Sequence, residues 1–389
     1  MIRVVHSNPV WLPQTQTWIH AQISHLPSHR VDSHVVCERT ENLDQFPVAR
    51  LHDFSSIGPL ERVWDRSLRR IGARRHLGFL VRVARSLKAD IIHSHFGDVA
   101  WSNLGAAKAL RCRHVVTFYG NDMSYLPRLQ AWPERYRALF RDVDLALCEG
   151  PHMARRIMRL GCPEAKVHVQ HLGIALERLP FKPRGWVAGQ KLRVLIAGTF
   201  TEKKGIPYAL QALGRLRRRV ELEITIVGDA RVQSANSQRE KRRILAAIEA
   251  SGLAGKVRLL GYQPHSKLIE LAYEHHVFLA PSVTAEDGDT EGGAPVSIIE
   301  MAASGMLVVS TRHCDIPEVI EDGKTGFLAN ERDVDELTDC LLTATRAPQR
   351  WPQMLASARK HVETEFDAGA QGARLATHYE TLAGGRSSA

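Results

Sequence analysis

The chain has 389 residues, which is too long for one ordinary hydrophobic core and predicts two domains of the usual size. Hydrophobic residues make up 44% of the sequence and charged residues 24%, as in soluble globular proteins. The net charge of +10 indicates an anionic partner, and nucleotide phosphates, an acidic membrane surface and nucleic acid would each satisfy it.

The cysteines and the start of the chain give expectations about the compartment. The six cysteines stand singly, without a C-x-x-C pair, and offer neither a zinc site nor a disulfide framework. The opening residues, MIRVVHSNP, lead directly into a predicted strand, with no secretory signal and no stretch long enough to span a bilayer. We therefore expect a cytoplasmic protein that is at most peripheral on the inner face of the membrane.

The first part of the chain is predicted to alternate short strands and helices. A strand at Ile2–His6 is followed by a polar loop and a helix that runs to about Leu26. Two further short strands are predicted at Ser33–Cys37 and Val48–Leu51. The segment Leu60–Lys88 is helical in character and is the most basic part of the chain. It is either a surface that lies against anionic lipid head groups or a solvated helix face whose arginines serve solubility.

Polar side chains stand at the ends of the next two predicted strands. The strand in ADIIHSHFG ends at His93 and His95 and is followed by a helix through Leu110. The next strand, in RHVVTFYGND, leads to Tyr119 and Asp122. Because open α/β sheets hold ligands at the carboxyl ends of their strands, we expect His95, Tyr119 and Asp122 to converge on one crevice. Alternatively, each histidine is a loop residue whose hydrogen bonds are satisfied within the fold.

A change of composition marks the predicted domain boundary. Residues 180–190, PFKPRGWVAGQ, are rich in proline and glycine and indicate a linker. After it, the β-α-β alternation restarts with a strand at Leu192–Ala197. Regular alternation of this kind implies parallel sheets covered on both faces. We therefore predict an α/β protein of two doubly wound, Rossmann-like domains, residues 1–183 joined by a C-terminal helix at 367–389, and residues 190–350.

The loop Gly198–Gly205, GTFTEKKG, joins a predicted strand end to a helix start. Its backbone N–H groups suit phosphate oxygens, and Lys203 or Lys204 supplies a positive charge. The loop matches neither the Walker pattern nor G-x-G-x-x-G, which argues against a nicotinamide-dependent dehydrogenase. The alternative is that these are ordinary surface lysines.

Residues Ala280–Thr311 place an acidic, glycine-rich loop between two apolar strands. Gly292 and Gly293 allow the backbone to approach a ligand closely. The helix that opens near Ala294 begins with unpaired N–H groups, which favour an anion. Glu300, inside that helix, is able to accept two hydrogen bonds from a ribose, which would offset its desolvation. Alternatively, Glu300 lies on the solvent face of the helix.

Motifs along nearly the whole chain carry a resemblance to a known family. In the first half they are IIHSHFG, TFYGND, CEGPHMARRIMRLGCPEAKV and HLGI. In the second half they are GTFTEKKG, IVGD, GY at 261–262, APS, EGGAPVSIIEMAASGMLVVST and DIPEVIEDGKTGFL. In this order they resemble the retaining GT-B glycosyltransferases of family four, or glycosyl transferases group 1, of exopolysaccharide and lipopolysaccharide type. The resemblance implies the GT-B fold, with an acceptor domain followed by a donor domain.

The same resemblance implies roles for individual residues. Lys204 would contact the donor diphosphate, Glu300 the ribose, and Tyr262 the base. Glu291 would match the first of the family's paired glutamates and meet the transferred sugar. The implied donor-binding residues are Gly198, Thr199, Lys204, Asp229, Tyr262, Ala294, Pro295, Val296, Ser297 and Glu300. The implied catalytic residues are Lys204, Glu291 and His95, and the implied acceptor-side residues are His95, Tyr119 and Asp122.

Two single residues depart from the family pattern. An arginine usually follows the first glycine of the phosphate loop, whereas this chain has Thr199, so Arg193, Lys203 or another cation would have to replace it. Tyr119 stands where the family often has the histidine of TFHG. A tyrosine is able to donate a hydrogen bond to a sugar hydroxyl but does not act as a base near neutral pH.

The spacing of the paired glutamates also departs from the pattern. The family has seven residues between them, whereas eight lie between Glu291 and Glu300. The extra residue falls at Gly292-Gly293, where a bulge would restore the geometry. Asp287-Gly288-Asp289 matches the metal-binding DxD pattern by its letters but not by its context.

The resemblance implies transfer of a hexose-type sugar from a UDP- or GDP-linked donor to a glycan or lipid-linked acceptor, with retention at the anomeric carbon. In the implied front-face route the leaving diphosphate accepts the acceptor's proton, so we expect neither a cofactor nor a metal. The expected partners are the nucleotide sugar, the acceptor and an anionic membrane surface through Leu60–Lys88, but not nucleic acid.

Two alternatives remain. One is a nucleotide-sugar epimerase on the same architecture, which would turn over the nucleotide sugar without an acceptor. The other is a non-catalytic protein that binds membranes or acidic polymers through the arginines of Leu60–Lys88.

Overall fold

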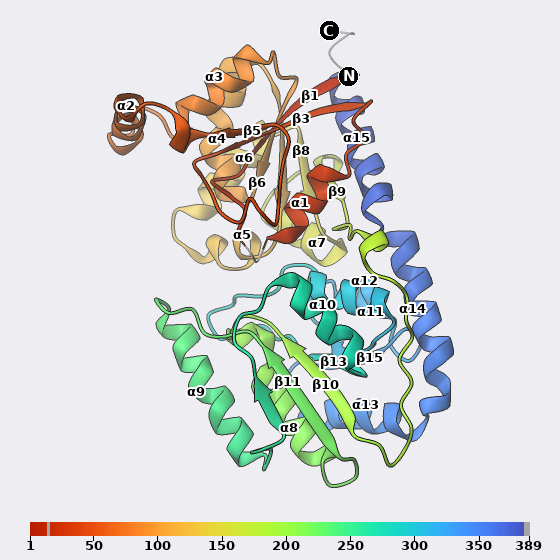
Figure 1. Cartoon of the computed structure of the whole chain (residues 1–389). Helices are drawn as coiled ribbons and strands as arrows, with labels where there is room; N and C mark the ends of the chain where they lie inside the picture. Colours follow the sequence, from red (N-terminus) through yellow and green to blue (C-terminus); the bar gives the residue numbers. More distant parts are fainter. Residues whose placement is uncertain (14–15, 385–389) are drawn as a thin grey trace. The chain divides into compact units, whose positions relative to one another are not determined.

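The computed structural model describes residues 1–13 and 16–384, which form two compact units. Unit 1 comprises residues 1–173 together with the chain from Asp367 onward, and unit 2 comprises Ile174–Phe366. Each unit has a parallel sheet with helices on both faces, which confirms the predicted fold class (Figure 1). Unit 2 is longer at both ends than the predicted range of 190–350.

The main sheet of unit 1 has the strand order β5-β3-β1-β6-β7-β8-β9, and all neighbouring strands are parallel. A separate parallel pair, β2 and β4, lies outside it. The strands are β1 (Ile2–Ser7), β2 (Val10–Trp11), β3 (Val31–Cys37), β4 (Arg39–Thr40), β5 (Leu51–Asp53), β6 (Ile91–His95), β7 (Arg113–Phe118), β8 (Leu145–Cys148) and β9 (Val167–Val169).

Alternate residues of β1 point to opposite faces of this sheet. Val4 packs with Leu375 and Tyr379 of α15, whereas Val5 packs with Leu80 of α3 on the opposite face. The C-terminal helix α15 is thus a structural part of unit 1. The helices of unit 1 are α1 (Thr17–Ser24), α2 (Pro59–Arg70), α3 (Gly78–Ser86), α4 (Gly97–Leu110), α5 (Asn121–Ser124), α6 (Trp132–Asp142), α7 (Pro151–Arg159) and α15 (Ala368–Gly384).

The basic segment predicted to be helical, Leu60–Lys88, is divided into the separate helices α2 and α3. The break lies at Gly72, whose φ of 75° is in the left-handed region that glycine adopts readily. After the break, Leu77 is buried and leads into α3, while α2 stands at the outer edge of the unit (Figure 1). The two helices therefore have different surroundings.

The sheet of unit 2 has the strand order β12-β11-β10-β13-β14-β15, again with parallel neighbours. Its strands are β10 (Leu192–Ala197), β11 (Leu222–Val227), β12 (Val257–Leu259), β13 (Val277–Ala280), β14 (Leu307–Thr311) and β15 (Phe327–Ala329). Its helices are α8 (Ile206–Leu216), α9 (Ala235–Ala250), α10 (His265–Glu274), α11 (Val296–Ser304), α12 (Ile316–Val319), α13 (Val334–Arg346) and α14 (Trp351–Glu365).

The segment predicted to be a linker packs against unit 2. Trp186 is 6% exposed and belongs to the core that covers one face of the sheet. The Arg184 guanidinium donates hydrogen bonds to the carbonyl oxygens of Ala272 and Ser304. The proline and glycine content of residues 180–190 indicated a lack of regular structure, which is correct. However, the tertiary contacts of Arg184 and Trp186 hold the segment against unit 2. None of the described helices has the length and the apolar run that crossing a bilayer requires.

Candidate functional site

Three loops of unit 2 meet where their strands end. A Cβ on Gly228, after β11, would lie 2.0 Å from the carbonyl oxygen of Gly198, after β10. The N–H of Gly228 also donates to the carbonyl of Gly261, after β12, at 2.8 Å. Gly228 has a φ of 129°, so both its backbone conformation and this close approach require glycine. The contacts place the predicted residues Gly198 and Tyr262 at one edge of the sheet, with Tyr262 48% exposed.

Lys204 and Glu291 form the central ion pair of this edge. The Lys204 Nζ lies 2.9 Å from Glu291 Oε1 and 3.0 Å from Oε2. The lysine side chain crosses Gly198, whose added Cβ would lie 3.1 Å from Lys204 Cδ. Ser282 donates to Glu291 Oε1 at 3.0 Å. An ammonium has three N–H donors, so Lys204 retains one for a further acceptor.

The environment of Glu291 keeps its carboxylate charged. Burial alone would raise the pKa of Glu291, but the charges of Lys204 and Lys203 outweigh burial and lower the pKa to about 2. Lys203 lies 3.1 Å from Asp289 and donates to the carbonyl of Thr290 at 3.0 Å. Burial lowers the pKa of Lys203, whereas Glu291 and Asp289 raise it, and the net shift is upward. At neutral pH the two lysines and the carboxylate of Glu291 are therefore charged and held together by ion pairs and hydrogen bonds.

Two residues that the sequence did not single out hold the acidic loop. The Glu291 N–H donates to His313 Nε2 at 3.1 Å, and His313 Nδ1 donates to Glu331 at 2.6 Å. Glu331 also accepts from the N–H of Thr284 at 2.7 Å, at the start of the same loop. The loop is thus tied at one end to the segment that follows β14 and at the other to the segment that follows β15. No pattern in the sequence indicates these long-range partners.

The helix after the acidic loop opens two residues later than predicted. Its first residue is Val296, preceded by Pro295 at the N-cap, so Ala294 belongs to the loop. The backbone N–H groups of Ala294, Val296 and Ser297 have no hydrogen-bond acceptor among the described residues. They are unpaired donors at the positive end of the helix dipole, an arrangement that suits an anion.

Glu300 lies inside α11 and is 8% exposed, so it does not lie on the solvent face. Its Oε1 is 2.8 Å from Nε2 of His265, the first residue of α10. The hydrogen bond to Glu300 outweighs burial and raises the pKa of His265. The Oε2 atom has no hydrogen-bond partner within residues 1–13 and 16–384 and is available to a ligand hydroxyl. Sequence reasoning missed His265 because it lies 35 residues from Glu300.

The structure limits which cation replaces the missing phosphate-loop arginine. Arg193 lies near the start of β10, whereas Thr199 follows the end of that strand, so the suggestion of Arg193 was wrong. Lys203 is held by the acidic loop. Arg231 is exposed and follows the β11 loop, and its charge acts on Lys203. The predicted donor residue Asp229 pairs with Lys241 at 2.8 Å.

In unit 1, His95 and Tyr119 are in direct contact but deeply buried. Tyr119 donates to Gln22 Oε1 at 3.3 Å, so its single O–H is used and His95 Nδ1 donates to the phenolic oxygen at 2.5 Å. The remaining nitrogen, His95 Nε2, then accepts from His6 Nδ1 at 3.1 Å. Burial lowers the pKa of His95 to about 3. His95 is therefore neutral, and both its nitrogens are engaged.

Asp122 lies near this pair, but its carboxylate accepts hydrogen bonds from backbone N–H groups. Its oxygens accept from the N–H groups of Gly97 at 3.0 Å, Gly120 at 2.8 Å and Tyr119 at 3.2 Å. Burial raises the pKa of Asp122 to about 6, against these backbone hydrogen bonds, which lower it. The predicted convergence of His95, Tyr119 and Asp122 is real in space, but Asp122 fixes the openings of α4 and α5.

A group of histidines in unit 1 has the proximity that a cation site needs. The candidate ligand atoms of His6, His93 and His95 lie within 4.8 Å of one another. However, the nitrogens of His93 contact Tyr379 at 2.6 Å and Thr117 at 2.7 Å. His6 Nε2 is the one ring nitrogen of these three described histidines without a partner. His6 and His95 are hydrogen-bonded to each other, whereas His93 is hydrogen-bonded to Tyr379 and Thr117.

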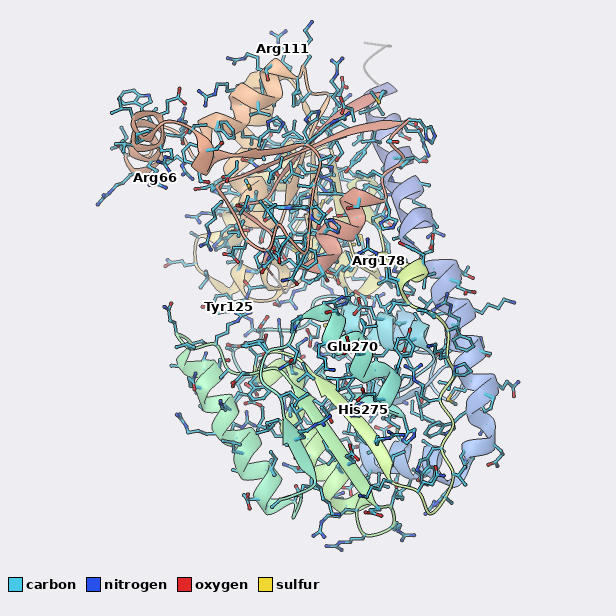
Figure 2. The ribbon with its side chains drawn as sticks, viewed as in Figure 1. Arg66, Arg111, Tyr125, Arg178, Glu270 and His275 are labelled. Carbon is cyan, nitrogen blue, oxygen red and sulfur yellow. The ribbon has the colours of Figure 1, made fainter. Side chains whose placement is uncertain are left out.

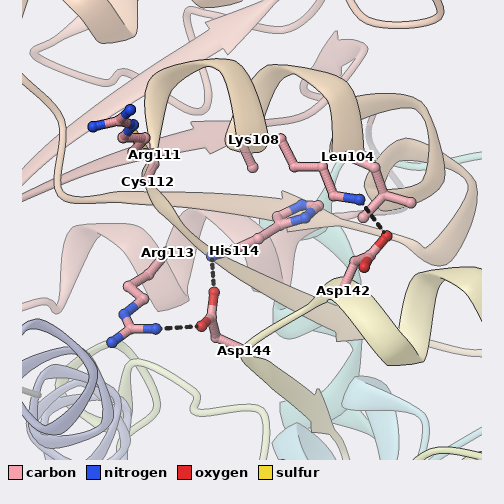
Figure 3. Close-up of a pocket in the computed structure, with 9 residues that line it drawn as sticks. Leu104, Lys108, Arg111, Cys112, Arg113, His114, Asp142 and Asp144 are labelled. Carbon is pink, nitrogen blue, oxygen red and sulfur yellow. Dashed lines mark hydrogen bonds and ion pairs between the residues drawn. The ribbon is translucent and has the colours of Figure 1, made fainter. Parts of the chain in front are cut away.

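A separate pocket of about 310 Å³ in unit 1 lies between α4, β7 and the end of α6 (Figure 3). Lys108 pairs with Asp142 at 2.7 Å, and Arg113 pairs with Asp144 at 2.8 Å. Arg113 begins β7, so this pocket lies at the amino end of the strand, away from His95 and Tyr119. Two ion pairs thus occupy most of its charged groups, and we do not assign it to the site.

The comparisons with known proteins identify the family. Residues 191–346 match the family described as glycosyl transferases group 1, and residues 15–178 match glycosyltransferase family 4. The chain belongs to this family of glycosyltransferases, as the motifs predicted.

Individual relatives agree with this assignment. The chain is 33% identical over 298 residues to the amylovoran biosynthesis glycosyltransferase AmsK of Erwinia amylovora, covering 76% of this chain and 71% of AmsK. It is 31% identical over 306 residues to the putative colanic acid biosynthesis glycosyltransferase WcaL of Escherichia coli strain K12, covering 77% of this chain and 73% of WcaL.

Solved structures with low sequence identity share the fold. Anabaena HepE, solved in complex with UDP and glucose, has a TM-score of 0.76 at 16% identity, covering 98% of this chain and 100% of HepE. A glycosyltransferase from Rickettsia africae has a TM-score of 0.74 at 15% identity, covering 98% of both chains. The fold is therefore of the GT-B class.

Proposed function

We propose that this protein transfers a hexose-type sugar from a UDP- or GDP-linked donor to a glycan or lipid-linked acceptor during assembly of a bacterial exopolysaccharide. The observation that carries the proposal is the Lys204–Glu291 ion pair on the loop that leads to the unpaired N–H groups of Val296 and Ser297. AmsK and WcaL are named for exopolysaccharide synthesis, and HepE was solved with UDP. The names of AmsK and WcaL support a glycan acceptor, and the UDP bound to HepE supports a nucleotide-sugar donor.

The site supplies a complementary group for each part of a nucleotide sugar. The α11 opening and the free N–H of Lys204 suit the diphosphate, because both present positive charge. Oε2 of Glu300 suits a ribose hydroxyl, and the half-exposed Tyr262 ring suits the base. Glu291 is charged and suits hydroxyls of the transferred sugar. In this arrangement the backbone of Gly198 and Thr199 would form part of the donor-binding loop. Asp229 would act indirectly, by holding Lys241, with which it forms an ion pair.

The charge state of Glu291 is compatible with a front-face transfer that retains the anomeric configuration. A carboxyl group with a pKa of about 2 stays ionised and does not donate a proton at neutral pH. The leaving diphosphate then accepts the acceptor's proton, while Lys204 and the helix opening stabilise its developing charge. The scheme requires neither a metal nor a cofactor. We assign acceptor recognition to unit 1, in which the buried His95 and Tyr119 would act by holding the surrounding structure rather than by touching the acceptor.

A donor screen tests this function. Nucleotide sugars with uridine, guanosine or adenosine bases are added one at a time to the full chain, with EDTA present, and the melting temperature is recorded. We expect one base to raise it, and product analysis with acceptor glycans to show transfer with retention. Turnover of the donor alone to its epimer would support the epimerase alternative. Failure of every donor to shift the melting temperature would refute both enzymes.

Arg231 offers a specific prediction for the phosphate site. If it replaces the missing arginine, Arg231→Gln should weaken donor binding about 10-fold or more, because a charge-assisted hydrogen bond contributes roughly 1.5–3 kcal/mol. The measurement is the donor KM and the affinity for the free nucleoside diphosphate. Arg239→Gln, on the following helix, is the control with the same chemistry. Equal effects of the two substitutions would show that Arg231 makes no specific contact.

A further inference from the structure

Helix α2 of unit 1 exposes its apolar side. Leu60 is 84% exposed, Val63 61%, Trp64 67% and the helix-terminating Ile71 74%. At 100° per residue these four positions fall on one face of the helix. Figure 1 shows α2 at the outer edge of the unit. Among the described residues, none packs on these four large hydrophobic side chains closely enough to bury them.

The charged side of α2 faces the protein instead. Asp65 is 5% exposed and accepts a hydrogen bond from the N–H of Gly78 at 2.9 Å. Its carboxylate also pairs with Arg74 at 2.8 Å, and Arg69 pairs with Glu38 at 2.7 Å. The helix is therefore anchored by its polar face, which is the reverse of the usual arrangement in a globular protein. The anchoring makes the apolar exposure a fixed feature of the fold.

Unpaired basic groups border the apolar face. Arg66 and Arg70 are exposed and form no ion pair with any described residue, and Figure 2 shows Arg66 pointing away from the unit. Beside α2, an open depression of about 500 Å³ is lined by Arg85 and by Arg74 and Arg82, which pair with Asp65 and Glu61 of α2. Arg85 has no ion-pair partner within the described chain. The surface thus joins an apolar strip to sites for anionic groups.

We propose that α2 docks on an anionic lipid bilayer, with Leu60, Val63, Trp64 and Ile71 entering the boundary between head groups and acyl chains. The flanking arginines would contact lipid phosphates. The pairing of a projecting apolar face with positive charge is the chemistry of an interfacial helix, and tryptophan favours that boundary. With 12 residues, the helix is too short to span a bilayer and lies in its plane. This docking is independent of the donor site.

Co-sedimentation of the full chain with vesicles tests the proposal without donor or acceptor. The vesicles contain phosphatidylglycerol and phosphatidylethanolamine, or phosphatidylcholine alone. We expect binding to the anionic vesicles, weakened by salt, and little binding to the neutral ones. Leu60→Ser with Trp64→Ser should reduce partitioning about 10-fold or more. Arg66→Glu with Arg70→Glu should reduce it about 25-fold or more, because each arginine near the surface contributes roughly a fivefold change and the two added negative charges are repelled.

Matched controls come from unit 2. Val187→Ser with Val232→Ser changes two valines that are 62% and 88% exposed, and Arg218→Glu with Arg219→Glu reverses two exposed arginines. Both control proteins should bind like the original chain. An unchanged melting temperature shows that each variant is folded, as the exposure of the substituted residues predicts.

Three outcomes would overturn the proposal. One is equal binding of all variants, and another is equal loss in the control pairs. The third is a change from dimer to monomer on Leu60→Ser with Trp64→Ser, measured by sedimentation without lipid, together with no vesicle binding by the original chain. That result would make the face a contact between two copies of this chain.

Discussion

Glu300→Ala is expected to abolish sugar transfer while leaving unit 2 folded. The substitution removes Oε2, whose two lone pairs are able to accept from the ribose hydroxyls while Oε1 stays with His265, and hydrogen bonds to a charged group contribute roughly 1.5–3 kcal/mol each. The value of kcat/KM should therefore fall about 100-fold or more. The free energy of unfolding should change by only about 1 kcal/mol, because the partner lost within the protein, His265, is partly exposed.

The matched control for this prediction is Glu270→Ala. Glu270 lies on α10, the helix that begins with His265, and pairs with Lys267 on the surface at 2.7 Å. Its loss should leave both kcat/KM and stability near those of the original protein. Transfer by Glu300→Ala at a rate close to that of Glu270→Ala would show that the donor site is assigned wrongly.

Glu291→Gln is expected to reduce both stability and transfer. The amide leaves the charge of Lys204 uncompensated and removes one of the two carboxylates that act on Lys203. A fall in pKa from the ordinary value of 4.5 to about 2 corresponds to stabilisation on the order of 3 kcal/mol at neutral pH. Because the transition state relies on the same charges, kcat/KM should also fall about 100-fold or more.

The pH dependence distinguishes this charge effect from a packing effect. A carboxyl group with a lowered folded-state pKa stabilises the fold fully above 4.5, and the contribution is lost as the pH falls toward 2. The difference in unfolding free energy between Glu291→Gln and the original chain should therefore shrink over that range. Glu286→Gln, an exposed position in the same loop, should show no such difference. A gap that stays constant with pH would contradict the assignment.

The sequence predicted the features that depend on local pattern. Strand ends, glycine loops and the anion-accepting helix start follow from neighbouring residues, and these patterns alone place Gly198, Lys204 and Ser297 at the correct sheet edge. The family motifs added separate roles for Lys204 and Glu291, but not the ion pair between them. The helix start at Val296 was missed by two residues because Pro295 serves as the N-cap.

Features that depend on distant partners were not predictable from one sequence. Asp122 lies two residues after Gly120 near a strand end, a position equally typical of a ligand contact and of a backbone cap, and only the fold shows that it accepts from Gly97. The basic segment indicated a membrane surface or a solvated face, but not which side of α2 points outward. That orientation depends on Asp65 meeting Gly78 and Arg74 across the turn at Gly72.

In the proposed donor site, the ties on the acidic loop affect how tightly a nucleotide sugar would be held. The contacts of Glu291 with His313, and of Thr284 with Glu331, restrict the loop in the absence of a ligand. Its conformational entropy is therefore lost during folding of the protein, and little remains to be lost when a ligand binds. A larger share of the contact energy is then expressed as affinity, so the loop acts as a pre-formed receptor.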